Sequence, residues 1–176
     1  MNKLLQNKNS ILLSCAVVAD VFIKIIVDHF LLEYRLLIND NVGFIPYLNT
    51  DQLSIFNNEL ELDMDLIYLI FINIIGIVAI VFIRNKLKKE KEWNKILDLT
   101  TLIILAGTVC SLIDKIFWKG SLDYLLFFSK IIDLKDIYLF VGIFVFIVDL
   151  CRQSIKEFLQ KNLIVARASN RKRNKR

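Results

Sequence analysis

The sequence predicts an all-α membrane protein with four transmembrane helices, a small loop or strand platform outside the cytoplasm, and both termini in the cytoplasm. Three observations lead to this prediction. Hydrophobic residues make up 56% of the 176 residues, which is more than a soluble domain of this size usually has. They gather in four runs that approach the length of a membrane span. Lysine and arginine, in contrast, gather on one side of those runs.

The four apolar runs define the predicted spans. A hydrocarbon core about 30 Å thick requires roughly 20 apolar residues in a helix. The runs extend from Ile11 to Leu32, from Leu66 to Ile83, from Ile96 to Phe117 and from Ile137 to Cys151. The fourth run is short, so we expect the helix to tilt or to begin upstream, near Ile131. A four-span membrane domain then covers residues 1–151, and residues 152–176 form a basic cytoplasmic tail.

The distribution of lysine and arginine predicts the orientation. The segment before the first run has two of them, the connector between the second and third runs has six, and the tail has nine, whereas the other two connectors have one and three. Cationic segments resist translocation, so the first three segments should face the cytoplasm and the other two the outside. The tail could also bind nucleic acid, but beside a span we expect it to bind anionic membrane lipid and no nucleic acid.

The cysteines and the histidine do not form a pattern typical of a metal site. Cys15, Cys110 and Cys151 all lie in apolar runs without C-x-x-C spacing, and His29 is the only histidine of the chain. A zinc site built from cysteine and histidine is therefore not expected. We expect an activity that uses no metal and no cofactor.

Charged residues inside the first run must face other helices. Asp20, Lys24 and Asp28 follow one another at a spacing of four, which places them on one helix face. Each charge near the centre of a bilayer costs roughly 2.5–3.5 kcal/mol on insertion scales. Asp20 and Lys24 then form either an ion-paired seam between helices or part of a catalytic site, and both interpretations stay open. Asp28 lies nearer the outer surface, where water can solvate it.

Two aspartates flank the last outer connector. Asp123 comes shortly after the third run and Asp136 comes immediately before the fourth, so both should lie at the outer end of the bundle. Two carboxylates held close together cannot both ionise cheaply, and they share a proton. Such a pair can activate a water molecule with one member and protonate a carbonyl oxygen with the other. This chemistry is peptide hydrolysis without a metal or a covalent intermediate.

The order of these residues resembles lipoprotein signal peptidase, also called signal peptidase II. That family has an aspartate and a lysine four apart in its first span, like Asp20 and Lys24. Its outer loop has Asn-Thr-Gly-Ala-Ala-Phe, of which Asn49 and Thr50 match, while residues 51–53 differ. Its third span ends in Gly-Gly-x-x-Gly-Asn-x-x-Asp-Arg, and residues 106–115 keep the second glycine, the aspartate and a basic residue.

Two further motifs extend the resemblance through the last connector. The family's Val-Val-Asp-Phe is similar to residues 121–124, and its Phe-Asn-x-Ala-Asp is similar to residues 132–136. The resemblance covers about residues 17–150 and implies that Asp123 and Asp136 are the catalytic dyad. It implies supporting or substrate-binding roles for further residues, namely Asp20, Lys24, Asn49, Ser111, Asp114, Lys115 and Asp133.

The resemblance implies an intramembrane aspartic endopeptidase of the bacterial cytoplasmic membrane. It would remove signal peptides from diacylglyceryl-modified prolipoproteins, as a monomer and without a metal. Departures from the family pattern at expected site residues include Ser111, which replaces an asparagine, Lys115, which replaces an arginine, and Asp133, which replaces an asparagine. Lysine cannot make the planar, bidentate contacts of a guanidinium, and Asp133 adds a third carboxylate beside the dyad. The site is therefore either retuned or inactive.

Two alternative functions remain. A non-catalytic relative would bind lipoproteins or other membrane partners and would use Asp123 and Asp136 only as surface carboxylates. A small transporter would need a continuous polar path along Asp20, Lys24 and Asp28. A protease, in contrast, needs the carboxylates of the dyad within reach of one bridging water.

Overall fold

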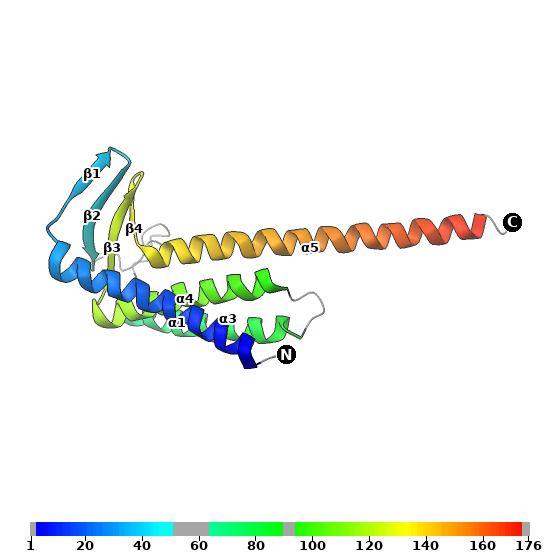
Figure 1. The fold of residues 1–176 in the computed structure, drawn as a ribbon, viewed down its shortest axis with the longest axis horizontal. Coiled ribbons are helices and arrows are strands. Elements are labelled where there is room, and N and C mark those ends of the chain that lie inside the picture. The colour runs from blue at the N-terminus through cyan, green and yellow to red at the C-terminus, as the bar shows by residue number, and fades with distance from the viewer. Residues whose placement is uncertain (1–2, 51–63, 90–93, 174–176) are drawn as a thin grey trace.

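A computed structural model describes residues 3–50, 64–89 and 94–173. The chain forms a helical bundle with a four-stranded antiparallel sheet at one end (Figure 1). The helices are α1 (Lys3–Ile26), which continues as the π-helix η1 (Val27–Leu31), α3 (Leu66–Leu87), α4 (Lys95–Phe117) and α5 (Leu134–Arg173). The strands are β1 (Leu36–Asn39), β2 (Val42–Asn49), β3 (Ser121–Phe127) and β4 (Lys130–Ile132), and they follow this order across the sheet.

Helix α4 is the centre of the bundle, since α1, α3 and α5 all pack against it. Two glycines allow α4 and α5 to approach closely. A Cβ on Gly107 would lie 2.7 Å from the side chain of Leu139, and one on Gly142 would lie 2.7 Å from that of Ile104. Small residues at such crossings are the usual means of close packing between membrane helices.

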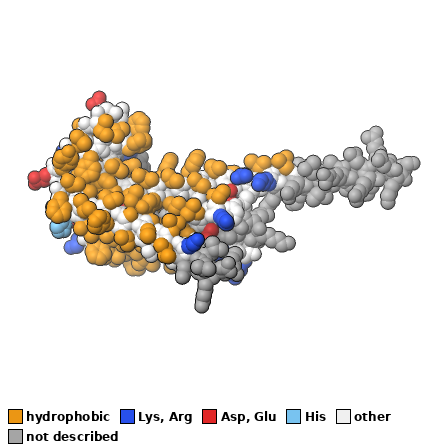
Figure 2. Space-filling model, in the orientation of Figure 1, with side chains coloured by type: hydrophobic (Ala, Val, Ile, Leu, Met, Phe, Trp, Pro, Cys, Tyr) orange, Lys and Arg blue, Asp and Glu red, His pale blue; other side chains and the backbone are white. Residues whose placement is uncertain are grey.

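The helical membrane fold with a small sheet agrees with the prediction from sequence. Among the described residues, three helical segments are long and apolar enough to cross a membrane: Lys8–Leu31, Leu66–Leu87 and Lys95–Phe117. Large apolar side chains cover the outside of the bundle, and charged ones gather toward its ends (Figure 2). An apolar surface of this extent is typical of a protein that contacts lipid.

The fourth predicted span differs from the structure at its start. We expected the helix to extend upstream to about Ile131, but this residue pairs with Leu126 in the sheet, and α5 begins only at Leu134. Strand pairing with β3 satisfies the backbone there, so the helix cannot include it. The apolar part of α5 therefore begins at Ile137, after Asp136.

The sheet is fixed to the C-terminal end of α1, where the helix continues as η1, by a small apolar core. Val27, Leu122 and Tyr124 are buried together, and partly buried side chains of β2 pack around them. Strand β3 lies between β2 and β4, and its first four residues are buried. This burial holds Asp123 at the junction of the sheet and the helices.

The π-helix changes which residues of α1 face inward. Asp20 and Lys24 are fully buried, as their spacing predicts, but Asp28 is only half-buried. A π-helix has i→i+5 hydrogen bonds and a wider turn, so it rotates the following side chains away from the α-helical face. Val27 is the next inward residue, with 2% of its surface exposed. Asp28 accordingly lies apart from the buried charges.

Candidate active site

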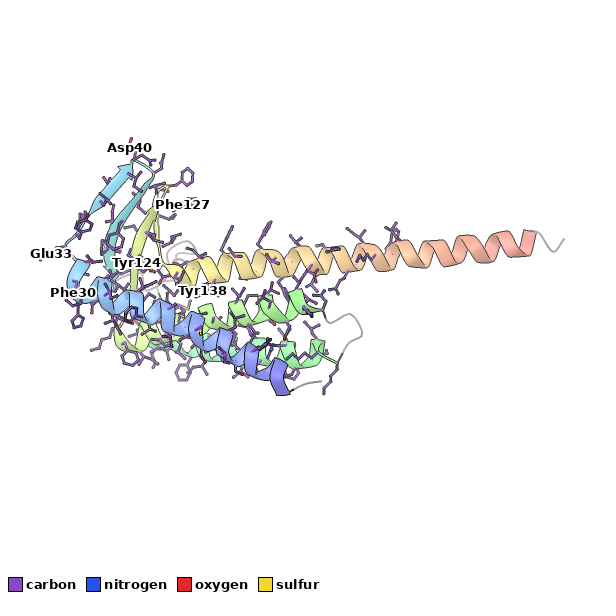
Figure 3. The ribbon with its side chains drawn as sticks, viewed as in Figure 1. Phe30, Glu33, Asp40, Tyr124, Phe127 and Tyr138 are labelled. Atoms are coloured by element: carbon purple, nitrogen blue, oxygen red, sulfur yellow. The ribbon has the colours of Figure 1, made fainter. Side chains whose placement is uncertain are left out.

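Buried charged residues gather where the C-terminal ends of α1 and α4 meet β3 and the start of α5. Figure 3 shows this junction through Tyr124 and Tyr138, whereas Asp40 lies at the far tip of the sheet. The cluster contains aspartates and lysines from all four elements: Asp20 and Lys24 of α1, Asp114 and Lys115 of α4, Asp123 of β3, and Asp133, Lys135 and Asp136 around the start of α5.

Lys24 joins three carboxylates inside the bundle. Its Nζ lies 2.5 Å from Oδ2 of Asp114, 2.5 Å from Oδ2 of Asp133 and 3.2 Å from Oδ2 of Asp20. All four side chains are 0% exposed. Lys24 therefore pairs with buried carboxylates of α1, α4 and the start of α5, which offsets part of the cost of burying these four charges. For Asp20 and Lys24 the sequence left two alternatives open, an ion-paired seam between helices and a place near the catalytic site. In the structure one cluster of charges fits both descriptions.

The start of α5 is fixed by a reciprocal pair of hydrogen bonds between Asp133 and Asp136. The backbone N–H of Asp136 donates to Oδ1 of Asp133 at 3.0 Å, and the backbone N–H of Asp133 donates to Oδ2 of Asp136 at 3.2 Å. This is the geometry of a capping box, in which two side chains satisfy free N–H groups at a helix start. Both aspartate and asparagine are good N-caps, so Asp133 keeps the capping ability of the asparagine in the family pattern.

Asp123 and Asp136 lie within reach of one bridging water. Carboxylate oxygens of Asp123, Asp133 and Asp136 all lie within 4.8 Å of one another. A water that makes two hydrogen bonds of about 2.8 Å can join oxygens up to about 5 Å apart. Asp123 is buried, whereas Asp136 is half-buried. Water can therefore approach the pair from the side of Asp136.

Burial changes the acidity of both carboxyl groups. Asp136 precedes the apolar part of α5, and burial raises the pKa of its carboxyl group to about 7, with Lys135 opposing and Asp133 and Asp123 adding to the rise. Burial also raises the pKa of Asp123, against the opposing effect of Lys135. Two carboxyl groups with raised pKa values at this distance can share one proton near neutral pH.

Lys135 is a site residue that the sequence did not single out. Its Nζ donates to Ser121 Oγ at 2.7 Å and to Asp133 Oδ2 at 2.5 Å, and it lies 3.0 Å from Asp114 Oδ2 and 3.3 Å from Asp123 Oδ1. The motif did contain a sign that Lys135 belongs to the site, because this lysine occupies the alanine position of Phe-Asn-x-Ala-Asp. A lysine in an outer connector is usually solvated, and this expectation concealed it.

The carboxylates around Lys135 are close enough to hold a cation. Asp123, Asp133 and Asp136 have the mutual spacing of a possible metal site. The ammonium of Lys135 contacts two of these three carboxylates. The lysine thus supplies positive charge at the position where a metal ion would bind.

The remaining predicted residues, Ser111 and Asn49, lie beside this cluster, and Ser111 contacts its member Lys115. Lys115 is 2% exposed, and its Nζ donates to Ser111 Oγ at 3.0 Å, so these two divergent positions contact each other. Asn49 is buried at the end of β2 and pairs with Ser121 in the sheet. The replacements after Thr50 fall on residues 51–53, outside the part of the chain that the structure describes.

An apolar groove of about 460 Å³ lies beneath the charged cluster, between α1, α4 and α5. Leu12 and Ala16 line it from α1, Leu102 and Ala106 from α4, and Tyr138 from α5. A transporter would need polar groups along this depth of the bundle. The groove has apolar walls instead, so the geometry of the described residues favours the protease over the transporter.

Comparison with known proteins decides the family. The family model of signal peptidase (SPase) II matches residues 12–152. The chain belongs to the signal peptidase II family. The resemblance drawn from the motifs is therefore confirmed, and with it an aspartic endopeptidase that acts on lipoprotein precursors in a bacterial membrane. A search of curated proteins found no match.

Two solved structures share the fold of this signal peptidase II. Both are described as bacterial membrane enzymes whose structures were determined by the in meso method, at 2.3 Å and 1.9 Å resolution. The first has a TM-score of 0.70 at 15% identity and covers 84% of this chain and 90% of its own. The second has a TM-score of 0.64 at 16% identity and covers 82% and 92%. At this identity they establish the fold alone.

Proposed function

We propose that Asp123 and Asp136 are the catalytic dyad of this signal peptidase II and that the divergent site is active. The proposal rests on one observation above all, the approach of their carboxylate oxygens to within 4.8 Å at the end of the bundle that carries the sheet. Near neutral pH the pair holds one proton. The ionised member takes a proton from water, and the protonated member donates to the carbonyl oxygen of the scissile peptide bond.

The reaction then needs only the return of these protons. The water oxygen bonds to the carbonyl carbon and forms a tetrahedral intermediate. The C–N bond breaks as the carboxyl group that took the proton of water gives it to the leaving nitrogen. The other carboxylate takes a proton from a hydroxyl of the intermediate as the C=O bond of the new carboxyl group forms. The pair returns to its starting state with one shared proton, without an acyl-enzyme.

We also propose that α5 is the fourth span and that both termini face the cytoplasm. In Figure 1 the start of α1 and the far end of α5 both lie away from the sheet. Helix α3 also ends away from the sheet (Figure 1), with Arg84 and Lys86 in its last turn and Lys88 after it. Exposed phenylalanines of α5, Phe140 and Phe144, support contact with lipid. The sheet would then face the outside.

The substrate in this proposal is a diacylglyceryl-modified prolipoprotein that enters from the membrane. The lining of the apolar groove includes Ile137, the residue that follows Asp136, and the groove would accept apolar residues of the signal peptide. Exposed apolar residues of the sheet, such as Leu37, Ile38 and Phe128, suit a surface that rests on lipid. Burial of acyl chains would then provide binding energy, and the peptide would need little sequence of its own.

Three asparagine substitutions test the dyad. Asp123→Asn and Asp136→Asn should each abolish cleavage of a lipidated prolipoprotein, because neither residue can then cycle between acid and base. Asp133→Asn is the matched control in the same cluster, since asparagine can still cap α5; it should retain cleavage. A fourth variant, Asp40→Asn at the tip of the sheet, should behave as wild type. Cleavage by Asp136→Asn together with loss in Asp133→Asn would make Asp133 the catalytic partner instead.

A further inference from the structure

Two neighbouring positions of the last motif differ from the family pattern together. The pattern has an asparagine and an alanine where this chain has Asp133 and Lys135. In the structure these two side chains are buried and form an ion pair with 2.5 Å between Nζ and Oδ2. Both members of a neutral pair have thus been replaced by charges of opposite sign. The net charge of the site stays the same, and Asp133 still caps α5.

The ammonium of Lys135 acts on Asp123 by two routes. The first is direct, because Nζ lies 3.3 Å from Oδ1 of Asp123. The second passes through Ser121, whose Oγ accepts a hydrogen bond from Lys135 at 2.7 Å and donates one to the same Oδ1 at 2.7 Å. Charge-assisted hydrogen bonds of this kind favour the ionised carboxylate. Asp136, in contrast, accepts the backbone N–H of Asp133, which is a neutral donor.

We propose that Lys135 is a positioning residue of the dyad, whose ammonium holds Asp123 as the ionised base and so places the shared proton on Asp136. The inference rests on the proposed dyad, and it assigns which of the two aspartates is the base and which is the acid. Asp123 takes the proton from water, and Asp136 donates to the carbonyl oxygen. The proton that Asp123 gains goes to the leaving nitrogen. Asp136 regains a proton from a hydroxyl of the tetrahedral intermediate as the C=O bond forms, and both residues return to their starting forms.

Other charged groups surround Asp123 and Asp136 and also influence how these two carboxyl groups titrate. Helix α1 contributes Asp20 and Lys24, α4 contributes Asp114 and Lys115, and the region around the start of α5 contributes Asp133, while Tyr124 lies beside Asp123 in β3. Lys24 is itself shared by three carboxylates. Among the described residues, Lys135 is the lysine that forms an ion pair with Asp123. Removing its ammonium therefore changes the charge next to Asp123 specifically.

The test is the pH dependence of cleavage by the purified full-length protein in detergent, with a lipidated prolipoprotein peptide as substrate. In Lys135→Met, which keeps an unbranched chain but removes the charge, the acidic limb of the kcat/KM profile should move upward by about one pH unit. At a pH on that limb the rate falls about tenfold and recovers at higher pH. Asp133→Asn should move the same limb downward, because it removes a negative charge beside Asp123. Lys86→Met, on an exposed residue at the other end of the bundle, should leave the profile unchanged.

The acidic limb should move in opposite directions in Lys135→Met and Asp133→Asn, and this difference separates a positioning role of Lys135 from a merely structural one. A structural role would lower the folded yield, or the rate at every pH, without moving the limb. If Lys135→Met does not fold, Asp133→Asn is compared with the double variant Asp133→Asn/Lys135→Met, which restores a neutral pair and differs only by the ammonium. The double variant should have its acidic limb at the higher pH. If Asp133→Asn and the double variant have identical pH profiles while Asp123→Asn and Asp136→Asn are both inactive, the role of Lys135 is overturned and the dyad stands. If Asp123→Asn is active, the dyad itself is overturned.

Discussion

Replacing Lys24 with methionine removes the cation that joins Asp20, Asp114 and Asp133 in the interior of the bundle. All of these groups are 0% exposed. Removing one partner of a buried ion pair typically costs about 3–5 kcal/mol, because the remaining charge is left uncompensated. Lys135 still contacts two of the carboxylates, so we expect about 3 kcal/mol. For a domain of this size that loss lowers the melting temperature by roughly 6–12 °C.

Thermal unfolding of the purified protein in detergent measures this loss, with tryptophan fluorescence or a thiol-reactive dye as the signal. Lys8→Met is the control, because it removes an exposed lysine near the start of the same helix. Adding Asp114→Asn to Lys24→Met removes one charge of each sign and should recover part of the stability. A Lys24→Met variant that melts within about 2 °C of wild type would refute the reasoning, since the cluster would then be solvated and its charges independent of one another.

The remaining predictions concern the proton, the helix packing and the topology. Cleavage should decline as the pH rises above about 7, because Asp136 then loses the proton that it must donate; a kcat/KM profile that stays flat to high pH contradicts this. Gly107→Ala should destabilise the fold by about 1–3 kcal/mol through the clash with α5, whereas Gly76→Ala, with its nearest neighbour at 3.5 Å, should melt close to wild type. A reporter inserted after Lys89 should be cytoplasmic and one inserted at Asp40 should be outside, and the reverse result would invert the proposed topology.

The sequence was sufficient to predict that Asp20 and Lys24 of the first span are buried and to predict the family to which the chain belongs. Charges in an apolar run have few places to lie except inside the bundle, so the spacing of Asp20 and Lys24 predicted their shared inward face. Motif order predicted the approach of Asp123 and Asp136, although the hairpin of β3 and β4 separates the two residues along the chain. In both cases a strong local constraint determined the outcome.

Other features depend on tertiary structure and could not be predicted from one sequence. The π-helix at Val27–Leu31 has no local signature, and it removed Asp28 from the face that an α-helix would give it. The short strand β4 forms because β3 offers a partner, and its pairing moved the start of α5 to Leu134. Lys135 resembled a solvated loop lysine until the surrounding carboxylates were placed in three dimensions.

The central claim is that this divergent signal peptidase II is active and uses Asp123 and Asp136. The most direct measurement is mass spectrometry of a diacylglyceryl-modified prolipoprotein after incubation with the purified full-length protein, below the pH at which Asp136 loses its proton. Wild type should release a signal peptide that ends immediately before the lipidated cysteine. Asp123→Asn and Asp136→Asn, with unchanged melting temperatures, should release none. A folded wild-type protein that leaves the lipidated precursor intact, or an Asp123→Asn variant that cleaves it, would contradict the account.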